Sequence, residues 1–239
     1  MLLGSGPSAW ASDFYVHPIR IVLGAQTPSV LLTIQNTASD PLRFQLNVFT
    51  WEQTPAGELI LAPTRDIIFF PKLLTLAPGE QRIVRVGTAA PASPVEKAYR
   101  LFVEELPPFE SEGQSSAGTV RVRARVGLPI FVPPANGRPA PRLAGTVVRR
   151  GHLSFELQNP GTVHVAPEGV RARGYGAGGE VVWEYEFEGW YVLANGRRTY
   201  AVDISRADCA KLHALAIEVT TGSQTLMDRV DLQADACAP

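Results

Sequence analysis

The chain of 239 residues has few cysteines, few histidines and no excess of charge of either sign. Its 22 Lys and Arg residues balance 23 Asp and Glu residues, so no basic field indicates a nucleic-acid partner. No long apolar run follows the first residues, and the sequence therefore predicts no membrane-spanning helix. The four histidines lack the spacing of metal ligands, and no cysteine lies near one, so no metal site is predicted.

Motifs that would indicate catalysis are equally scarce. Glu104 and Glu105 are neighbours in an expected strand and point to opposite faces, so they cannot flank one bond together. Residues 174–179 match GxGxxG, but the residues that follow alternate like a strand, whereas a dinucleotide site needs a helix there. A hairpin loop is predicted instead. The sequence predicts neither an enzyme nor a cofactor site.

Patterns typical of long helices are also missing, while 21 Gly and 20 Pro are spread along the chain. Short runs of Val, Ile, Leu, Phe and Thr recur between turn residues, which predicts an all-β protein of immunoglobulin-like sandwiches. Pro78-Gly79 is one expected turn. Phe69 and Phe70 cannot both face inward if their stretch is extended. The leucines of the following stretch are expected in the core: Leu73, Leu74 and Leu76.

One segment is especially rich in Pro, Gly and Asn. It reads VPPANGRPAPRLAG over residues 132–145, as expected of an exposed domain boundary. We therefore predict a first domain over 12–134, a linker over 135–142 and a second β-sandwich over 143–239.

The N-terminus of the chain suggests export, and export bears on the two cysteines near the other end. Ala9-Trp10-Ala11 resembles a small-x-small cleavage site, so residues 1–11 are interpreted as the remnant of a signal peptide, with an ordinary disordered N-terminus as the alternative. In an exported protein, Cys209 and Cys237 favour a disulfide that closes a loop of about 28 residues. Two unpaired buried thiols are the alternative.

The segment TVRVRARVGLPIFVPP, residues 119–134, alternates over an unusual length. One side carries an apolar row, and the other side begins with Arg121, Arg123 and Arg125. The row consists of Val120, Val122, Ala124, Val126 and Leu128, and continues to Ile130 and Val132. The strand is either half buried, with solvated arginines, or it presents its apolar side to another protein, because an uncovered apolar strand invites aggregation.

Several separated motifs resemble one family. HPIRIVL, LTLAPGEQRIVRV, YRLFVEELPP and LPIFVPP follow one another as in the periplasmic pilus-assembly chaperones of the chaperone–usher pathway, and LQNPGTVHV resembles the second domain of that family. The resemblance covers roughly residues 13–239 and is most specific in the first domain.

The resemblance implies two immunoglobulin-like domains set in an L and a periplasmic, non-enzymatic chaperone of a Gram-negative bacterium. Its partners would be fimbrial or pilus subunits and an outer-membrane usher, and no cofactor is implied. Such a chaperone donates a strand to a subunit that lacks its last one, in a β-augmentation. The donated row would be Val120, Val122, Ala124 and Val126, extending to Leu128. A divergent branch, such as one that assembles thin archaic-type fibres, is also suggested.

The family anchors the subunit's C-terminal carboxylate with an Arg and a Lys. Arg20 matches the Arg, but the Lys position falls near Gly127 or Leu128, and neither is basic. Arg100 or Arg125 is expected to stand in, with Arg100 favoured. Glu96 matches an acidic residue that ties the two domains together, but its usual basic partner falls at Phe131 or Val132, so apolar contacts are expected there instead.

A protein of another class is the main alternative: a two-domain immunoglobulin-like structural or adhesive surface protein without a client. A fibre subunit should carry an N-terminal donor segment with apolar residues at every second position. Only Phe14, Val16 and Pro18 resemble such a segment. A secreted enzyme or carbohydrate-binding module has no supporting group of residues.

Overall fold

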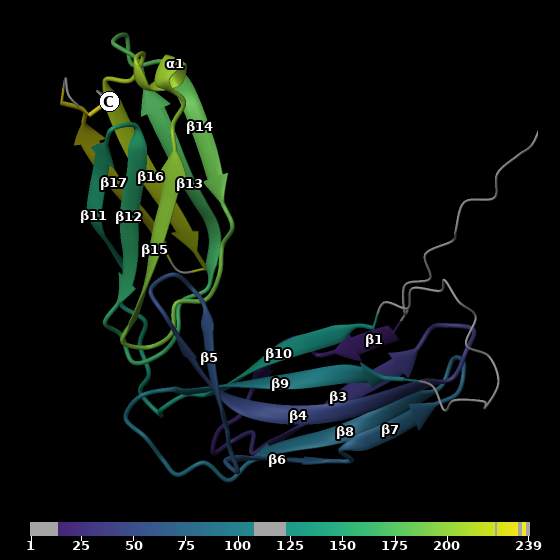
Figure 1. The fold of residues 1–239 in the computed structure, drawn as a ribbon. Coiled ribbons are helices and arrows are strands. Elements are labelled where there is room, and N and C mark those ends of the chain that lie inside the picture. Colours follow the sequence, from purple (N-terminus) through teal and green to yellow (C-terminus); the bar gives the residue numbers. More distant parts are fainter. Residues whose placement is uncertain (1–13, 108–122, 223, 234–235, 238–239) are drawn as a thin grey trace, which may run out of the picture. The chain divides into compact units, whose positions relative to one another are not determined.

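Strands account for almost all regular structure in this computed structural model (Figure 1), which describes residues 14–107, 123–222, 224–233 and 236–237. The helix that it contains, α1 (Arg206–Cys209), is a single turn. Its N-cap is Ser205, whose hydroxyl accepts a 3.1 Å hydrogen bond from the Asp208 N–H. The predicted all-β class is confirmed. No described helix has the length and apolar character needed to cross a membrane.

The chain divides into two compact units. The first unit contains residues 1–50, 61–91 and 97–132, and the second contains 51–60, 92–96 and 133–239. The second unit thus begins close to the predicted linker, but it also includes two earlier segments that no composition change marks in the sequence.

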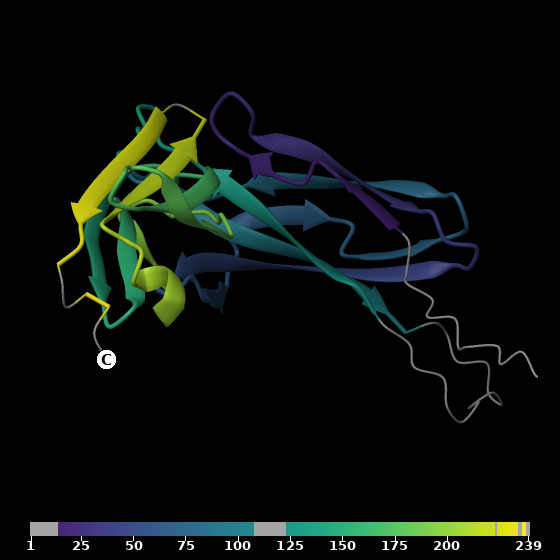
Figure 2. The same ribbon diagram turned by 90° about the horizontal axis from the view of Figure 1, so that it is seen from above.

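Two sheets form the first unit (Figures 1 and 2). One sheet has the order β1 (Phe14–His17), β3 (Ser29–Asn36), β8 (Gln81–Thr88) and β6 (Ile67–Phe70). The other has the order β2 (Ile21–Val22), β10 (Arg125–Val132), β9 (Lys97–Leu106), β4 (Leu42–Gln53) and β5 (Leu59–Pro63), and β7 (Leu73–Leu76) also pairs with β4.

Alternation along these strands builds the core of the first unit. Buried residues alternate with less buried ones along much of β3, β4 and β8, as at Leu32, Phe44 and Val84, whereas β9 is buried without interruption from Tyr99 to Val103. In β6, Phe69 is buried while Phe70 is 76% exposed, which confirms that only one of the two faces inward.

The prediction of a core position for Leu73 is wrong. Its side chain is 63% exposed, whereas Leu74 and Leu76 are buried. Leu73 and Leu74 are neighbours in β7 and must point to opposite faces of the sheet, so both cannot enter the core.

The second unit is also a pair of sheets around one core. One sheet has the order β11 (Arg142–Arg149), β12 (His152–Asn159) and β15 (Gly196–Asp203). The other has the order β14 (Val181–Phe187), β13 (Pro167–Tyr175), β16 (Ala214–Thr221) and β17 (Gln224–Asp231). Strands β13 and β14 form an antiparallel hairpin whose turn places Gly179 at φ +83°, so the segment 174–179 covers the end of β13 and the turn of the predicted hairpin.

Hydrogen bonds attach the predicted linker to the second unit. The Arg138 N–H donates to the Thr162 hydroxyl over 3.1 Å, and the Thr162 N–H donates to the Arg138 carbonyl over 2.9 Å. Near the C-terminus, a disulfide joins Cys209 at the end of α1 to Cys237, with the two Cα atoms 5.7 Å apart. The proposed signal remnant, residues 1–11, lies outside the described residues.

Candidate functional site

Strand β10 has one paired edge and one largely open edge. It pairs antiparallel with β9 over its whole length, and the two strands remain side by side in both views (Figures 1 and 2). On the other edge, β2 pairs only with Ile130 and Phe131, and the Leu23 N–H donates to the Phe131 carbonyl over 2.9 Å. Among the described residues, no strand pairs with the segment from Arg125 to Gly127 on this side.

The hydrogen bonds of β10 show which backbone groups face the open edge. The Ala124 carbonyl accepts a 3.0 Å bond from the Glu105 N–H, so even-numbered residues bond toward β9. Phe131 bonds toward β2, in keeping with the alternation of an antiparallel strand. The N–H and C=O groups of Arg125 and Gly127 therefore point to the open edge, where a further strand could hydrogen-bond.

The residues of the predicted donor row differ in burial along the strand. Val120 and Val122 lie outside the described residues, and Ala124 is half-buried. Val126 packs partly against the core of the first unit, and Leu128 is a buried member of that core at 2% exposure. The open part of the row thus ends before Leu128, because β2 and the facing sheet already cover the strand from there onward.

Arg125, one of the three expected carboxylate anchors, is held by β9. Its guanidinium lies 3.9 Å from the centre of the Phe102 ring, and its Nε is 2.6 Å from Glu104 Oε1. On the outward face of the sheet, these contacts pair the Arg125 charge with Glu104 and stabilise the packing of β10 against β9.

The sheet register brings the other two expected anchors, Arg20 and Arg100, close together. In the parallel pairing, Ile21 lies opposite Ile130, so Arg20 precedes β2 at the level of Pro129. Pro129 lies opposite Arg100 on its other side. With strands about 4.8 Å apart, the two arginines are separated by roughly 10 Å of backbone. Arg20 is exposed, whereas Arg100 is 6% exposed.

Gly127 makes room for the Arg100 guanidinium. A Cβ atom at Gly127 would lie 3.5 Å from Arg100 Nη2 and only 2.9 Å from Phe102 Cε1. A cation from the adjacent strand therefore lies beside the space left by the absent side chain at Gly127. The sequence analysis favoured Arg100 as the stand-in, but it could not predict the contact with Gly127, because that contact depends on the register of β9 and β10.

At the start of β9, Tyr99 is tied to the loop before β6. Its hydroxyl donates a 2.6 Å hydrogen bond to Asp66 Oδ2, and Lys97 Nζ lies 3.6 Å from the same oxygen. Burial, followed by this hydrogen bond, raises the pKa of Tyr99 well above its usual range. The phenol therefore stays neutral and donating.

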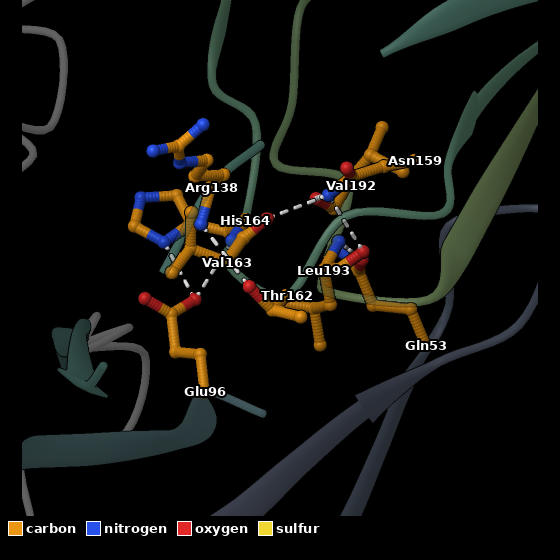
Figure 3. Close-up of polar contacts among 9 residues, drawn as sticks. All are labelled: Gln53, Glu96, Arg138, Asn159, Thr162, Val163, His164, Val192 and Leu193. Atoms are coloured by element: carbon orange, nitrogen blue, oxygen red, sulfur yellow. Dashed lines mark hydrogen bonds and ion pairs between the residues drawn. The ribbon is translucent and has the colours of Figure 1, made fainter. Parts of the chain in front are cut away.

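Glu96 has a partner that the sequence did not predict (Figure 3). Its Oε1 accepts a 2.9 Å hydrogen bond from the His164 N–H and lies 2.7 Å from His164 Nδ1. The Glu96 side chain is 3% exposed and both residues belong to the second unit. A histidine 68 residues away in the sequence thus supplies both donors to Glu96, and the expectation of apolar contacts between the domains stays a prediction.

Two amides organise the same end of the second unit (Figure 3). The Asn159 Nδ2 donates to the carbonyls of Val163, Val192 and Leu193. Gln53, from the 51–60 segment, donates to the Tyr191 carbonyl over 3.0 Å and accepts from the Leu193 N–H over 3.3 Å. Asn159 lies in the LQNPGTVHV motif, which the sequence identified without showing its partners.

No cluster of His, Cys, Asp or Glu that could hold a metal occurs among the described residues. A search of the curated proteins finds no match. Solved structures with a similar fold include the CsuC–CsuE chaperone–tip adhesion subunit complex of archaic Csu pili from Acinetobacter baumannii. It has a TM-score of 0.63 and 19% identity, over 91% of this chain and 98% of that one.

Two further structures share the fold at similarly low identity. The Salmonella enterica complex of SafA pilin with the SafB chaperone has a TM-score of 0.59 and 14% identity, over 93% of this chain and 99% of that one. The Pseudomonas aeruginosa CupB2 chaperone has a TM-score of 0.56 and 16% identity, over 92% of this chain and all (100%) of that one.

These similarities show a shared fold, and the predicted fold class is confirmed. The comparison with protein families is more specific. The family model described as "Pili and flagellar-assembly chaperone, PapD N-terminal domain" matches residues 13–138. That match spans more than half of the chain and includes β1 to β10. The chain belongs to the PapD-like family of pilus-assembly chaperones.

Proposed function

We propose that this protein is a periplasmic chaperone that binds fimbrial subunits by donating the strand segment that begins near residue 119. The observation that carries the proposal is the open edge of β10 at Arg125 and Gly127, next to a row of apolar residues at every second position. An open strand edge supplies main-chain hydrogen bonds, and alternate side chains fill pockets in the partner.

The position of the core limits which residues are donated. Leu128 belongs to this protein's own core, so the donated row ends at Ala124 or Val126. The subunit-binding residues of the proposal are therefore Val120, Val122 and Ala124, with Val126 at the boundary. Burial of these side chains in a groove of the subunit would contribute several kcal/mol, part of which is lost to ordering and association.

Arg20 and Arg100 support an anchor for the subunit's terminal carboxylate. They flank Pro129 in one row of the sheet, at the end of the open edge. Among the described residues no carboxylate is in ion-pair contact with Arg20, which leaves its charge accessible to a ligand. Arg125 is less suited to this role, since Glu104 already pairs with it.

Delivery to an outer-membrane usher requires a surface away from the client edge. The outward face of the β1-β3-β8-β6 sheet exposes apolar side chains in neighbouring register: Leu31 and Phe70 lie on either side of Arg85, and Ile68 and Ile83 adjoin them. Exposed apolar patches of this kind mark interaction sites. We assign this face to the usher, and Phe70→Glu is expected to block fibre export without preventing subunit capture.

Co-expression with candidate fimbrial subunits, followed by capture of the complex from the periplasm, tests the proposal. Ala124→Asp places a charge in the donated row and is expected to abolish capture, because a carboxylate cannot enter an apolar pocket unpaired. Ala177→Asp, the same change at an exposed turn of the second unit, is the matched control. Capture by the Ala124→Asp variant at the wild-type level would contradict strand donation. It would favour a structural or adhesive protein without a client.

A further inference from the structure

Strand donation accounts for the apolar side of the segment 119–132 but not for its cationic side. Arg123 and Arg125 alternate with the donor row, so they lie on the outward face of the sheet, away from the core. A strand that only fills an apolar groove does not need guanidinium groups on its other side. The charges around Arg123 and Arg125 therefore help to determine which partner strand can bind beside β10.

Among the described residues at this end, the arginines of the outward face outnumber its carboxylates. Arg125 pairs with Glu104, which also accepts a 3.4 Å hydrogen bond from Asn47. Arg43 lies opposite Leu106, two residues beyond Glu104, and its Nη1 donates to the Pro107 carbonyl over 2.9 Å. Arg123 is exposed, and no carboxylate among the described residues forms an ion pair with it.

The open edge places any added strand directly beside these arginines. The backbone groups of Arg125 and Gly127 point outward from β10, and Pro129 has no N–H to extend the ladder toward β2. In a neighbouring strand, side chains directly across from Arg123 and Arg125 would lie about 4.5–5.5 Å away between Cβ atoms. Opposite charges at such positions are favourable, and like charges are unfavourable.

We propose that Arg123, next to the Arg125–Glu104 ion pair, selects a partner strand that carries a carboxylate opposite it. The inference rests on the proposed function, since the partner is the subunit strand that adds to the open edge of β10. That carboxylate occupies the solvent side of the strand, opposite Arg123. The Arg123 charge also accelerates the encounter with an acidic partner at low salt.

Two synthetic peptides test this charge selection on the full-length ¹⁵N-labelled protein. Both are 11-residue strands with Thr and Val on one side, and they carry either Glu or Lys on the other. We expect the Glu peptide to bind at least about tenfold more tightly than the Lys peptide at low ionic strength. The amide signals of Arg125 and Gly127 should shift. The preference should shrink as salt is added, because exposed charges are screened.

Arg123→Glu is expected to reduce the preference for the Glu peptide to about threefold or less. Arg149→Glu, the same change at an exposed position of β11, should leave it unchanged. Equal binding of both peptides, shifts confined to another edge such as β14, or an equal effect of Arg149→Glu would overturn the inference.

The subunit capture experiment separates this inference from the proposed function. If Ala124→Asp abolishes capture while Arg123→Glu leaves the peptide preference intact, charge selection by Arg123 is wrong and strand donation stands. If the preference for the Glu peptide depends on Arg123 while Ala124→Asp captures subunits normally, strand donation is wrong and the acid-selective edge stands.

Discussion

The guanidinium of Arg100 lies over Gly127, with Nη2 3.5 Å from the point that a Cβ atom would occupy. Phe102 lies closer still, at 2.9 Å from that point, and its ring is held by Arg125 on one side and by Phe49 nearby. Arg100, Phe102 and Gly127 therefore form one packing unit on the outward face of the sheet. Its geometry determines where the Arg100 charge sits.

A methyl group at Gly127 should disturb this unit. Gly127→Ala forces the Phe102 ring to move, and overpacking of this kind is expected to lower the free energy of unfolding by about 1–3 kcal/mol. Urea unfolding measures the change. Gly169→Ala is the control, because no atom lies within 4 Å of its added Cβ. Equal stability of the two variants would contradict the close packing at Gly127.

If Arg20 anchors the carboxylate of the subunit, replacing it should weaken subunit binding without unfolding the protein. Arg20→Ala removes an exposed guanidinium, so the unfolding curve should stay unchanged while capture of a fimbrial subunit falls by at least about tenfold. Arg20→Lys should retain part of the binding, since it keeps the charge but not the planar fork. The outcome that removes Arg20 from the anchor is full capture by the Ala variant.

Two histidine–carboxylate pairs of equal length should differ in their contribution to stability. His164 Nδ1 and His152 Nδ1 each lie 2.7 Å from a carboxylate oxygen, but Glu96 is 3% exposed whereas Asp203 is 89% exposed. His164→Ala leaves a buried carboxylate short of donors and should lower the free energy of unfolding by about 1–3 kcal/mol. His152→Ala should change it by less than about 0.5 kcal/mol.

His164→Asn provides a second control for this pair, because its amide can donate from nearly the same place as Nδ1. Partial rescue of stability relative to the Ala variant is expected, measured by thermal unfolding at one pH. A result in which His152→Ala is as destabilising as His164→Ala would show that burial of Glu96 is not the deciding factor.

Stability should fall at alkaline pH through Tyr99. Its pKa is raised from the usual 10.0, so the folded state holds the phenol proton more tightly than the unfolded chain. The contribution is complete below pH 10.0 and is lost as the pH rises toward the folded-state value.

Tyr99→Phe isolates that contribution, because all other titrating groups are common to both proteins. The variant should be less stable by about 1–2 kcal/mol at pH 7 through loss of the hydrogen bond to Asp66. The difference should narrow above pH 10.0, as followed by urea unfolding across the range. A constant difference up to pH 11 would contradict a raised pKa.

Local alternation made much of the first unit predictable from the sequence. Period-2 patterns placed the strands around Phe44 and Val84 and separated Phe69 from Phe70, because the side chains of a strand must alternate whatever the partner strand is. The same rule applied to Leu73 and Leu74 would have excluded Leu73 from the core, where hydrophobicity alone had placed it.

Register and long-range pairing were not predictable. The contact of Arg100 with the space over Gly127 depends on how β9 aligns with β10, and the Glu96–His164 pair joins residues 68 apart. Phe131 is a further case: it lies on the arginine-bearing side of the segment but is fully buried, which the alternation of the segment does not predict. Hydrophobic periodicity identifies the apolar side of a strand, but it does not identify the residues that pack against that side.

The second unit is assembled from three separate stretches of the chain, and this restricts how the protein can be rearranged during evolution. A gene segment encoding residues 133–239 alone would carry Leu193 without the Gln53 amide that bonds it, and His164 without the Glu96 carboxylate. Such a segment would lack part of the second unit and could not be exchanged between proteins as an independently folding domain. Recombination among relatives should therefore preserve residues 51–60 and 92–96 together with the C-terminal half, or replace all three at once.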